Sequence, residues 1–583
     1  MSDLIQKARR LWKQKKYARS IEAYHKLLLT DPKNIDILTD MIQIYSEVKQ
    51  IDLCFEMARR LENVDVDNVI AKYFQAYCLF ARKRTVHSRR KIMEILNINP
   101  THKESLILLS QICFVQHNYG LALKINQQID DDTIETLDQR ASILVELGQC
   151  KRANEIFKLL WERIPTNRNF LSNYLQTLMF LDGVSNQLIQ EKHSLVNEIF
   201  DQHINEFPIS STQSVWKKGE KIRIGYVSCD LCNHPVSNCL LPIVKHHNRD
   251  EFEVFIFATN NRKSDDITKY YHDFSEKFIT LSVSPTLAIK QIMSMNIDVL
   301  VDTIGHTGHH ILHLFHQRLA QIQISMIGYC GPSGIKNMDY VVVDEYTVPV
   351  EHQTNFSYFH EKLMYQSPIF APYVPLQELP SSGRNKKITG LRFGSTHKVP
   401  KISSYTIRMW STVLHRIPYS TMCFYRDGLC EESIRQLKAQ FLENGIEEKQ
   451  LEFHTDILKN RSSHLEIYQD IDFLLDVQPW SGHITACESL AMGVPIITMS
   501  GENHAGRMVA SILHCLGRDE WIAQTVDDYA TCVSAAVDSW NPLQRKHLRK
   551  QFLKSSICNG LQYTQKFEEN IQNIIKKNPS TLA

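Results

Sequence analysis

The sequence predicts a superhelix of paired helices followed by two doubly wound α/β domains that face each other across a cleft. Two observations lead to this prediction. In the first third of the chain, equivalent residues recur at multiples of 34 positions, the period of a stacked helix pair. From residue 220 onward, short β-branched apolar runs alternate with helical stretches, and this alternation occurs twice. A chain of 583 residues is long enough for several such domains.

The helical repeats are expected over the first 166 residues. The equivalent pairs are Tyr17 and Tyr119, Pro32 and Pro100, Ala8 and Ala76, and Ser20 and Ser88. Small residues let two helices pack closely, and proline ends the second helix because it lacks a backbone N–H. This pattern is typical of tetratricopeptide repeats, and a shortened fifth unit follows at 143–165. We therefore expect about five repeats over 1–166 that bind a partner in a concave groove, with an unrelated helical bundle as the alternative.

The remaining boundaries follow from the change of pattern. A helical connector is expected over 167–219, and it ends in a polar linker from 209. The predicted strands are 221–230, 252–260, 297–305 and 338–345 in a first domain (220–388), and 391–396, 421–427, 451–457, 471–477 and 495–501 in a second (389–540). A less regular segment, 346–388, joins the two domains, and helices are expected over 541–583. Doubly wound sheets bind ligands at the carboxyl ends of their strands, so we expect the chemistry between the two domains.

Charge and composition exclude several classes of protein. The formal net charge is only +2, so no global field attracts nucleic acid or an acidic membrane. No apolar run approaches the roughly 20 residues that span a bilayer, and the charged N-terminus does not resemble a signal peptide. The fourteen cysteines are scattered through apolar stretches, which indicates free thiols in a reducing compartment. We expect a cytoplasmic protein with no nucleic-acid partner and no membrane span.

Two clusters of cysteine and histidine residues could in principle bind a metal ion. In "CDLCNHP", Cys229 and Cys232 precede His234, and Cys239 follows closely. A structural zinc site needs four ligands, and no second Cys-x-x-Cys strengthens the pattern. A redox pair is less favoured, because such a motif normally opens a helix in a small domain. In "GHTGHH" (305–310), three histidines follow another predicted strand. We interpret the cysteines as packing residues and the histidines as cleft lining, so no metal is expected.

The segment "PWSGHITACESLAMG" (479–493) carries the clearest ligand-binding pattern. A predicted strand ends before it, and small and hydroxyl residues then lead into a helix that bears Glu488. Such a helix start exposes unpaired backbone N–H groups, and the helix dipole favours a phosphate there. An ordinary capped helix is the structural alternative.

Several long segments, in order along the chain, resemble the O-linked N-acetylglucosamine transferase family. They are "IRIGYVSCDLCNHPVS", "DTIGHTGHHILHLFHQRLAQIQISMIGYCGPSG", "MDYVVVDE" and "SGHITACESLAMGVPIITMSGENHAGRMVASIL", preceded by the repeats. This is glycosyltransferase family 41, which also includes the plant SPINDLY proteins and bacterial relatives. The resemblance covers about residues 1–560 and implies a GT-B fold, a nucleotide-sugar donor, no catalytic metal and a protein acceptor. The short 346–388 segment is similar to that of the bacterial members, which lack the large insertion of animal members.

The resemblance also assigns roles to residues of the second domain. His483, Ile484 and Thr485, preceded by Ser481 and Gly482, are implied to hold the donor diphosphate, and Glu488 the ribose. Lys401 is implied to pair with the leaving diphosphate. His464 matches the base pocket, and Lys459, Asn460 and Arg461 match the segment beside it. The chain departs from the family pattern at Thr396-His397-Lys398, which puts the donor contact expected at Lys398 in doubt.

Three residues of the first domain are expected on the acceptor side of the cleft. His234 matches a family histidine near the sugar and the acceptor, where it either takes the proton of the attacking hydroxyl or orients the substrate. His306 and Tyr329 are expected to line the cleft beside it.

The sequence therefore predicts an inverting, metal-independent protein O-glycosyltransferase that needs no cofactor beyond its nucleotide-sugar substrate. Within the resemblance, His483 favours UDP-N-acetylglucosamine as the donor, and the family implies Ser or Thr of a protein as the acceptor. UDP-glucose or GDP-fucose as donor and Asn as acceptor remain alternatives within the same chemistry. From another class, the chain would be a repeat scaffold with a degenerate transferase body.

Overall fold

The computed structural model describes residues 2–202, 216–259, 264–351, 356, 358–385, 387–458 and 461–577. The chain divides into two compact units, Met1–Leu144 and Val145–Ala583. Most of the polar linker that the sequence predicts lies outside the described residues. None of the helices in the described ranges is both long and apolar enough to cross a membrane.

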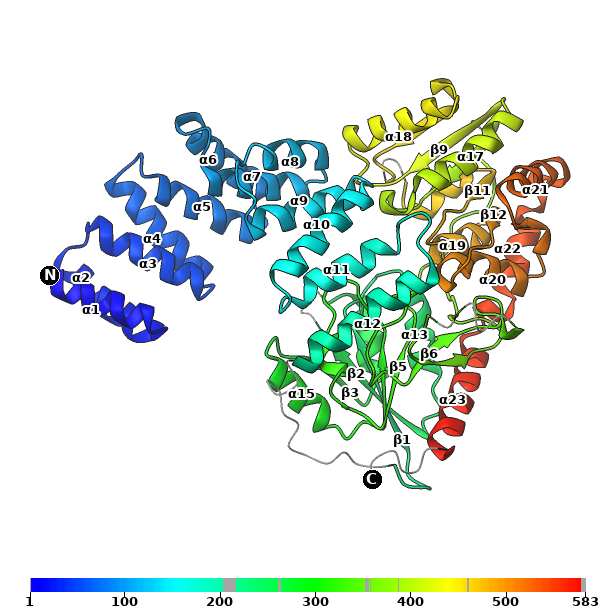
Figure 1. The fold of residues 1–583 in the computed structure, drawn as a ribbon, viewed down its shortest axis with the longest axis horizontal. Helices are drawn as coiled ribbons and strands as arrows, with labels where there is room; N and C mark the ends of the chain where they lie inside the picture. Colours follow the sequence, from blue (N-terminus) through cyan, green and yellow to red (C-terminus); the bar gives the residue numbers. More distant parts are fainter. Residues whose placement is uncertain are drawn as a thin grey trace. The chain divides into compact units, whose positions relative to one another are not determined.

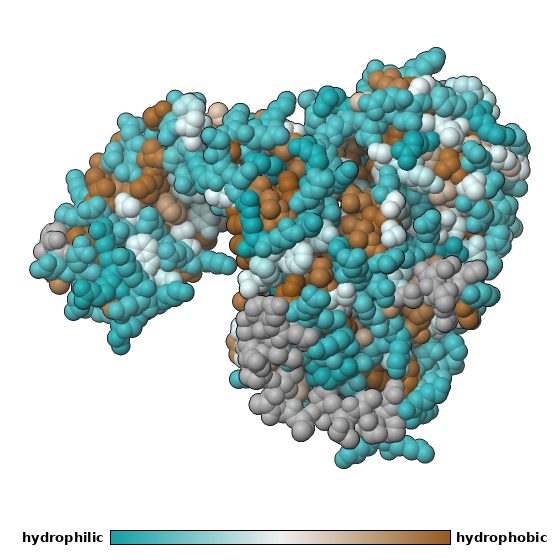
Figure 2. Space-filling model, in the orientation of Figure 1, coloured by the Kyte–Doolittle hydropathy of each residue, from teal (hydrophilic) through white to brown (hydrophobic). Residues whose placement is uncertain are grey.

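The first unit consists of antiparallel helix pairs that follow the predicted period (Figure 1). Its helices are α1 (Ser2–Lys13), α2 (Tyr17–Thr30), α3 (Ile35–Glu47), α4 (Ile51–Val64), α5 (Val69–Ala81), α6 (Thr85–Ile98), α7 (Lys103–Val115), α8 (Tyr119–Asn126) and α9 (Ile134–Glu146), whose last two residues belong to the second unit. Figure 2 shows apolar surface over these repeat helices. Leu29, Val66 and Val86 of this unit are each more than two-thirds exposed. Exposed apolar surface of this kind is typical of proteins that bind another chain.

The small residues of the repeats hold each helix pair together. In each of the first four pairs, a hydroxyl or thiol donates a hydrogen bond to a backbone carbonyl of the partner helix. The bonds are Ser20 to Ala8 (2.9 Å), Cys54 to Ile42 (3.5 Å), Ser88 to Ala76 (2.7 Å) and, with the helices exchanged, Ser110 to Ala122 (2.8 Å). The donor residue is small in all four pairs and its partner is alanine in three of them, in agreement with the predicted tetratricopeptide pattern.

The second unit begins with three further helices, α10 (Cys150–Arg163), α11 (Arg168–Leu178) and α12 (Asn186–Gln202). The predicted fifth repeat is therefore divided, because α10 belongs to the α/β body and not to the unit of the first four pairs. The Cys150 thiol donates to the carbonyl of Pro400, 3.5 Å away, so α10 contacts the segment that carries Lys401.

The first sheet has seven parallel strands in the order β3-β2-β1-β4-β5-β6-β7. They are β1 (Ile222–Ser228), β2 (Phe252–Ala258), β3 (Lys277–Thr280), β4 (Val299–Asp302), β5 (Ile322–Ser325), β6 (Tyr340–Val343) and β7 (Lys362–Tyr365). The sequence predicts only β1, β2, β4 and β6. The other three strands have four residues each and either carry polar residues or lie in the irregular segment, so they have no clear strand pattern.

The second sheet has six parallel strands in the order β10-β9-β8-β11-β12-β13. They are β8 (Leu391–Ser395), β9 (Ser420–Tyr425), β10 (Leu451–His454), β11 (Phe473–Leu475), β12 (Ile496–Met499) and β13 (Ile522–Ala523), of which the sequence misses only the two-residue β13. The strand order reverses at β1/β4 in one sheet and at β8/β11 in the other. Ligands bind at such positions in doubly wound sheets.

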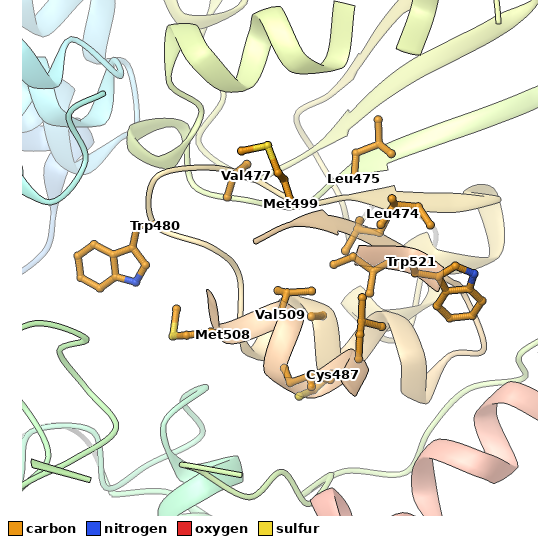
Figure 3. Close-up of a cluster of buried hydrophobic side chains, with 14 of the residues drawn as sticks. Leu474, Leu475, Val477, Trp480, Cys487, Met499, Met508, Val509 and Trp521 are labelled. Carbon is orange, nitrogen blue, oxygen red and sulfur yellow. The ribbon is translucent and has the colours of Figure 1, made fainter. Parts of the chain in front are cut away.

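Helices between the strands and after the last strand complete both α/β domains. They are α13 (Ser237–His246), α14 (Asp266–Asp273), α15 (Pro285–Met293), α16 (Leu312–Phe315), α17 (Ser404–Arg416), α18 (Glu431–Glu443), α19 (Ile484–Ala491), α20 (Met508–Cys515), α21 (Val526–Ser539), α22 (Arg545–Leu553) and α23 (Gly560–Lys577). Figure 3 shows the core of the second domain, to which Leu474 and Leu475 of β11 and Val509 of α20 contribute. Trp480 and Met508 lie at one end of this cluster, and both also line a cavity.

The last helix returns to the first domain. Phe567 and Ile571 of α23 are buried in the same core as residues of β1, β2 and β4, and Figure 1 shows α23 running beside this sheet. Glu568 accepts hydrogen bonds from the backbone N–H of Asn248 and lies 2.8 Å from Nδ1 of the buried His247. The C-terminal helix is therefore an integral part of the first domain, although the second domain separates them in the sequence.

Truncation of Phe567 tests this packing. We expect Phe567→Ala to lower the free energy of unfolding by about 3–5 kcal/mol, because it leaves a cavity under the first sheet. The measurement is a urea titration followed by circular dichroism. Gln565→Ala, at an exposed position of the same helix, is the matched control and should change the midpoint little. Equal midpoints for the two variants would show that α23 does not support the first domain.

Candidate active site

A cavity of about 500 Å³ lies where the strands of the two sheets end. The first domain contributes residues that follow β1 and β5, and the second contributes residues that follow β8, β9, β10 and β11. Eight of the residues predicted for the site line it, namely Lys398, Lys401, His464, Gly482, His483, Ile484, Thr485 and Glu488. The structure thus brings together side chains that lie as much as 90 positions apart in the sequence.

Lys401 supplies a cation to the cavity wall. It ends a short 3-10 helix, η3 (Val399–Lys401), and its Nζ donates to the carbonyl oxygen of Ser481 at 3.0 Å. The same ammonium group lies 5.0 Å from the centre of the Trp480 ring. Burial lowers the pKa of Lys401 to about 8. At neutral pH the side chain therefore carries a charge that is weakly solvated and available to an anion.

The N-terminus of α19 meets Lys401 in this cavity. The helix starts at Ile484, and no side chain caps it at the preceding residue, His483. Among the described residues, Nε2 of His483 has no hydrogen-bond partner, and burial lowers the pKa of this imidazole to about 4. The helix start therefore presents free backbone N–H groups and a neutral imidazole beside an ammonium group. This combination suits a phosphate.

A buried carboxylate that the sequence analysis missed shapes this helix start. Asp476 follows β11, and its Oδ1 accepts the backbone N–H of Gly482 at 2.8 Å. Its Oδ2 accepts the hydroxyls of Ser481 (2.8 Å) and Thr498 (2.6 Å). Burial opposes ionisation, but the nearby His397 and hydrogen bonds from Thr498 and Gly482 leave the pKa of Asp476 below its usual value. The only signal in the sequence is an aspartate at the end of an apolar strand.

The side chain of Ser481, a residue expected in the donor site, does not line the cavity. Its hydroxyl is fully buried and bonded to Asp476, and the backbone N–H of Val509 donates to it at 3.2 Å. Only its carbonyl oxygen contributes to the site, as the acceptor for Lys401.

His464 and Glu488 form a pair on another wall of the cavity. Nε2 of His464 lies 3.0 Å from Oε1 of Glu488, and this hydrogen bond raises the pKa of His464. The Tyr468 hydroxyl donates to the other carboxylate oxygen at 3.3 Å. Arg461 does not line the cavity, because it forms an ion pair with Asp470 (2.8 Å). Lys459 and Asn460 lie outside the described residues.

His234 does not line the cavity, although Pro235 and Val236, which directly follow it, do. Its Nδ1 is 3.6 Å from Oδ2 of Asp230, and its side chain is 35% exposed. The imidazole is therefore accessible and lies beside a carboxylate. This arrangement fits either of the two roles that the sequence left open.

The predicted cleft positions of His306 and Tyr329 are wrong. Both ring nitrogens of His306 are used, since Nδ1 lies 2.9 Å from the Ser172 hydroxyl and Nε2 lies 2.9 Å from the carbonyl of Ser333. The Tyr329 hydroxyl lies 2.8 Å from Nε2 of His193, on α12. Both side chains are buried against the helical connector, so they tie α11 and α12 to the first domain.

Two of the cysteines in and after "CDLCNHP" have different surroundings. The buried Cys229 thiol donates to the carbonyl of Gly308, whereas Cys239, which follows the segment, is buried and lines the cavity. Within the part of the chain that the structure describes, no three His, Cys, Asp or Glu side chains gather in a way that would hold a metal ion.

The sequence model of glycosyl transferase family 41 matches residues 152–371 and 390–567, about two thirds of the chain. This chain belongs to glycosyltransferase family 41. Both matched ranges lie in the second unit, and together they contain every lining residue of the cavity.

Curated relatives of the family 41 chain include plant proteins. A Petunia hybrida protein named probable UDP-N-acetylglucosamine–peptide N-acetylglucosaminyltransferase SPINDLY is 26% identical over 426 residues, which cover 71% of this chain and 45% of the relative. The Arabidopsis thaliana protein of the same name is 27% identical over 423 residues, covering 71% and 46%. The chain thus spans about half the length of the curated relatives that it matches.

One solved structure shares the fold over most of the chain. It is a mutant of the Thermobaculum terrenum O-GlcNAc transferase, with a TM-score of 0.78 and 24% identity, and the match covers 88% of this chain and 98% of that one. The expected order of a helical repeat region and a GT-B-type pair of parallel sheets is therefore confirmed.

The lowered pKa of Lys401 predicts how its reactivity toward an acylating reagent depends on pH. We expect the rate of Lys401 acetylation by brief acetic anhydride pulses to rise with a midpoint near pH 8, the value to which burial lowers its pKa. An ordinary lysine loses its proton near pH 10.4. Mass spectrometry of a digest measures the rate, and the exposed Lys387 corrects for reagent hydrolysis. A rate that keeps rising beyond pH 9.5 would contradict the described environment of Lys401.

Proposed function

We propose that this chain is an inverting, metal-independent protein glycosyltransferase that moves N-acetylglucosamine from UDP-N-acetylglucosamine to Ser or Thr side chains. The observation that carries the proposal is the meeting of Lys401 with the uncapped start of α19 in one cavity between two doubly wound sheets. The names of the plant relatives support a UDP-N-acetylglucosamine donor and a peptide acceptor.

In the proposed reaction, the acceptor hydroxyl attacks the anomeric carbon on the face opposite the diphosphate. The bond from that carbon to the diphosphate oxygen breaks, and its electron pair leaves with the diphosphate. Lys401 and the free N–H groups of α19 face the oxygens on which this charge develops. The anion also raises the pKa of Lys401, so the lysine stays protonated during the step.

The remaining cavity residues suit the two ends of the substrate pair. Glu488 offers carboxylate oxygens to the ribose hydroxyls, and its bonds to His464 and Tyr468 fix its orientation. On the opposite side, His234 takes the proton of the acceptor hydroxyl, and Asp230 stabilises the imidazolium that forms. The repeats of the first unit recruit the protein acceptor through their exposed surface.

A donor screen tests the proposed function. The purified full chain is incubated with UDP- and GDP-linked sugars, with and without EDTA, and both donor hydrolysis and transfer to peptide mixtures are measured by mass spectrometry. We expect UDP-N-acetylglucosamine to be used fastest, at a rate that EDTA does not change. Loss of activity with EDTA and recovery with Mg²⁺ or Mn²⁺ would overturn metal independence. Turnover of none of the donors would favour a scaffold.

Substitution of Lys401 tests the assignment of the leaving-group contact. We expect Lys401→Ala to lower kcat by about 10²-fold or more, because one cation at a developing diphosphate charge is worth several kcal/mol. Lys387→Ala removes an exposed lysine outside the cavity and should leave the rate unchanged. Circular dichroism checks the fold of both variants. A Lys401→Ala rate within a few-fold of the parent at saturating donor would refute the assignment.

A further inference from the structure

A second buried histidine lies directly beneath the start of α19, and none of the roles described so far includes it. His397 follows β8, lines the cavity and is only 4% exposed. Its Nε2 lies 3.4 Å from Oδ1 of Asp476 and 3.4 Å from the hydroxyl of Thr485. Its Nδ1 lies 3.1 Å from the hydroxyl of Ser395. The imidazole therefore connects the carboxylate that shapes the turn to a hydroxyl in the first turn of the helix.

The close fit of Gly482 shows how tightly this imidazole is held. A Cβ atom on Gly482 would lie 2.9 Å from Nε2 of His397 and 2.7 Å from the Thr485 hydroxyl oxygen. Any side chain at this position would force the imidazole or the hydroxyl to move. The missing side chain of Gly482 thus leaves room for His397 to reach the turn from below.

The protonation state of His397 decides what the Thr485 hydroxyl does. When Nδ1 carries the proton, Nε2 is an acceptor and the Thr485 hydroxyl donates to it. When both nitrogens are protonated, Nε2 becomes a donor toward Asp476, and the ring no longer accepts from Thr485. The hydroxyl then turns its proton into the cavity, where the diphosphate is expected.

Charged groups on both sides of His397 affect its pKa in opposite directions, and a bound anion would change their net effect. Burial lowers the pKa of His397, Asp476 opposes this shift, and Lys401 and Arg426 add to it. Lys398 lines the same cavity from the segment that follows β8. A bound diphosphate offsets the repulsion from these cations, while the attraction of Asp476 remains. Binding therefore favours the imidazolium.

We propose that His397, held by Asp476, is a positioning residue that takes up a proton when the donor diphosphate binds and so directs the Thr485 hydroxyl toward the phosphate. This inference rests on the proposed function, because it requires that the cavity binds a nucleoside diphosphate. It assigns to this chain a charge that appears only when the site is filled.

Calorimetric titration of the full-length protein with UDP tests the inference. The titrations are run at pH 6.5 in two buffers of different ionisation enthalpy, and the difference in measured heat gives the number of protons taken up. Lys401 is already protonated at this pH because its pKa is about 8, so it contributes little to the count. His397→Gln and His397→Asn keep a hydrogen-bonding side chain but cannot take up the proton. His415→Gln, at an exposed position of α17, is the control for removing a histidine.

We expect the parent and His415→Gln to take up several tenths of a proton more than the two His397 variants. We also expect the His397 variants to bind UDP roughly tenfold more weakly. They lack the positive charge below the diphosphate and no longer direct the Thr485 hydroxyl toward it. Equal proton uptake in all four proteins, with UDP bound, would overturn the inference and leave the proposed function standing. Failure of the parent to bind UDP would instead overturn the proposed function, and the inference with it.

Discussion

The carboxylate of Asp476 is the constraint on which the site depends. It is almost fully buried, and it fixes the backbone at Gly482 and the hydroxyls of Ser481 and Thr498 at once. Since the Ser481 carbonyl is the acceptor for Lys401, the same turn that opens α19 also holds the lysine. A single ionised side chain thus sets the relative position of the cation and the helix start.

The site also depends on contacts between segments that are distant in the sequence. Arg507, at the start of α20, donates to the carbonyl of Tyr346 (2.9 Å) and to the hydroxyl of Ser500 (2.7 Å), so it connects the end of the first domain to a loop of the second. The helix α23 carries the chain back to the first sheet and buries Phe567 there. Contacts between distant segments therefore tie the two domains together beyond the segment that joins them in the sequence.

Periodicity predicts most of the fold, because the spacing of residues directly reflects helix pairs and strands. The small residues at Ala8 and Ser20 and their equivalents led to the repeats. The strands β3, β5, β7 and β13 were missed because each is short and lacks a clear apolar pattern. The repeats also share a feature that sequence reasoning does not reveal. The turns between paired helices place Lys15, Lys49, Lys83 and His117 in the left-handed region, although none is a glycine. Tertiary packing determines these conformations, whereas local preference opposes them.

Only part of the candidate site was predicted from the sequence. A motif identifies which segment reaches the cleft, but it does not say which way each side chain points. Lys401, His483 and Glu488 line the cavity as expected, whereas Tyr329 lies in an equally recognisable segment and points toward α12. Asp476 and His397 act from behind the turn, so no ligand-binding motif marks them. Their importance emerges only from the distances that join them.

The charges in the cavity explain why a site for an anion is built from weakly solvated cations. Burial lowers the pKa values of Lys401 and His397 before any ligand is present, although Lys401, with a pKa of about 8, keeps most of its charge at neutral pH. In the proposed reaction, the arriving diphosphate raises both pKa values, and the proton that His397 takes up strengthens its binding. When the nucleoside diphosphate leaves, His397 releases this proton and the attraction falls again. Under this proposal the site holds the leaving group while charge develops on it and still releases the product.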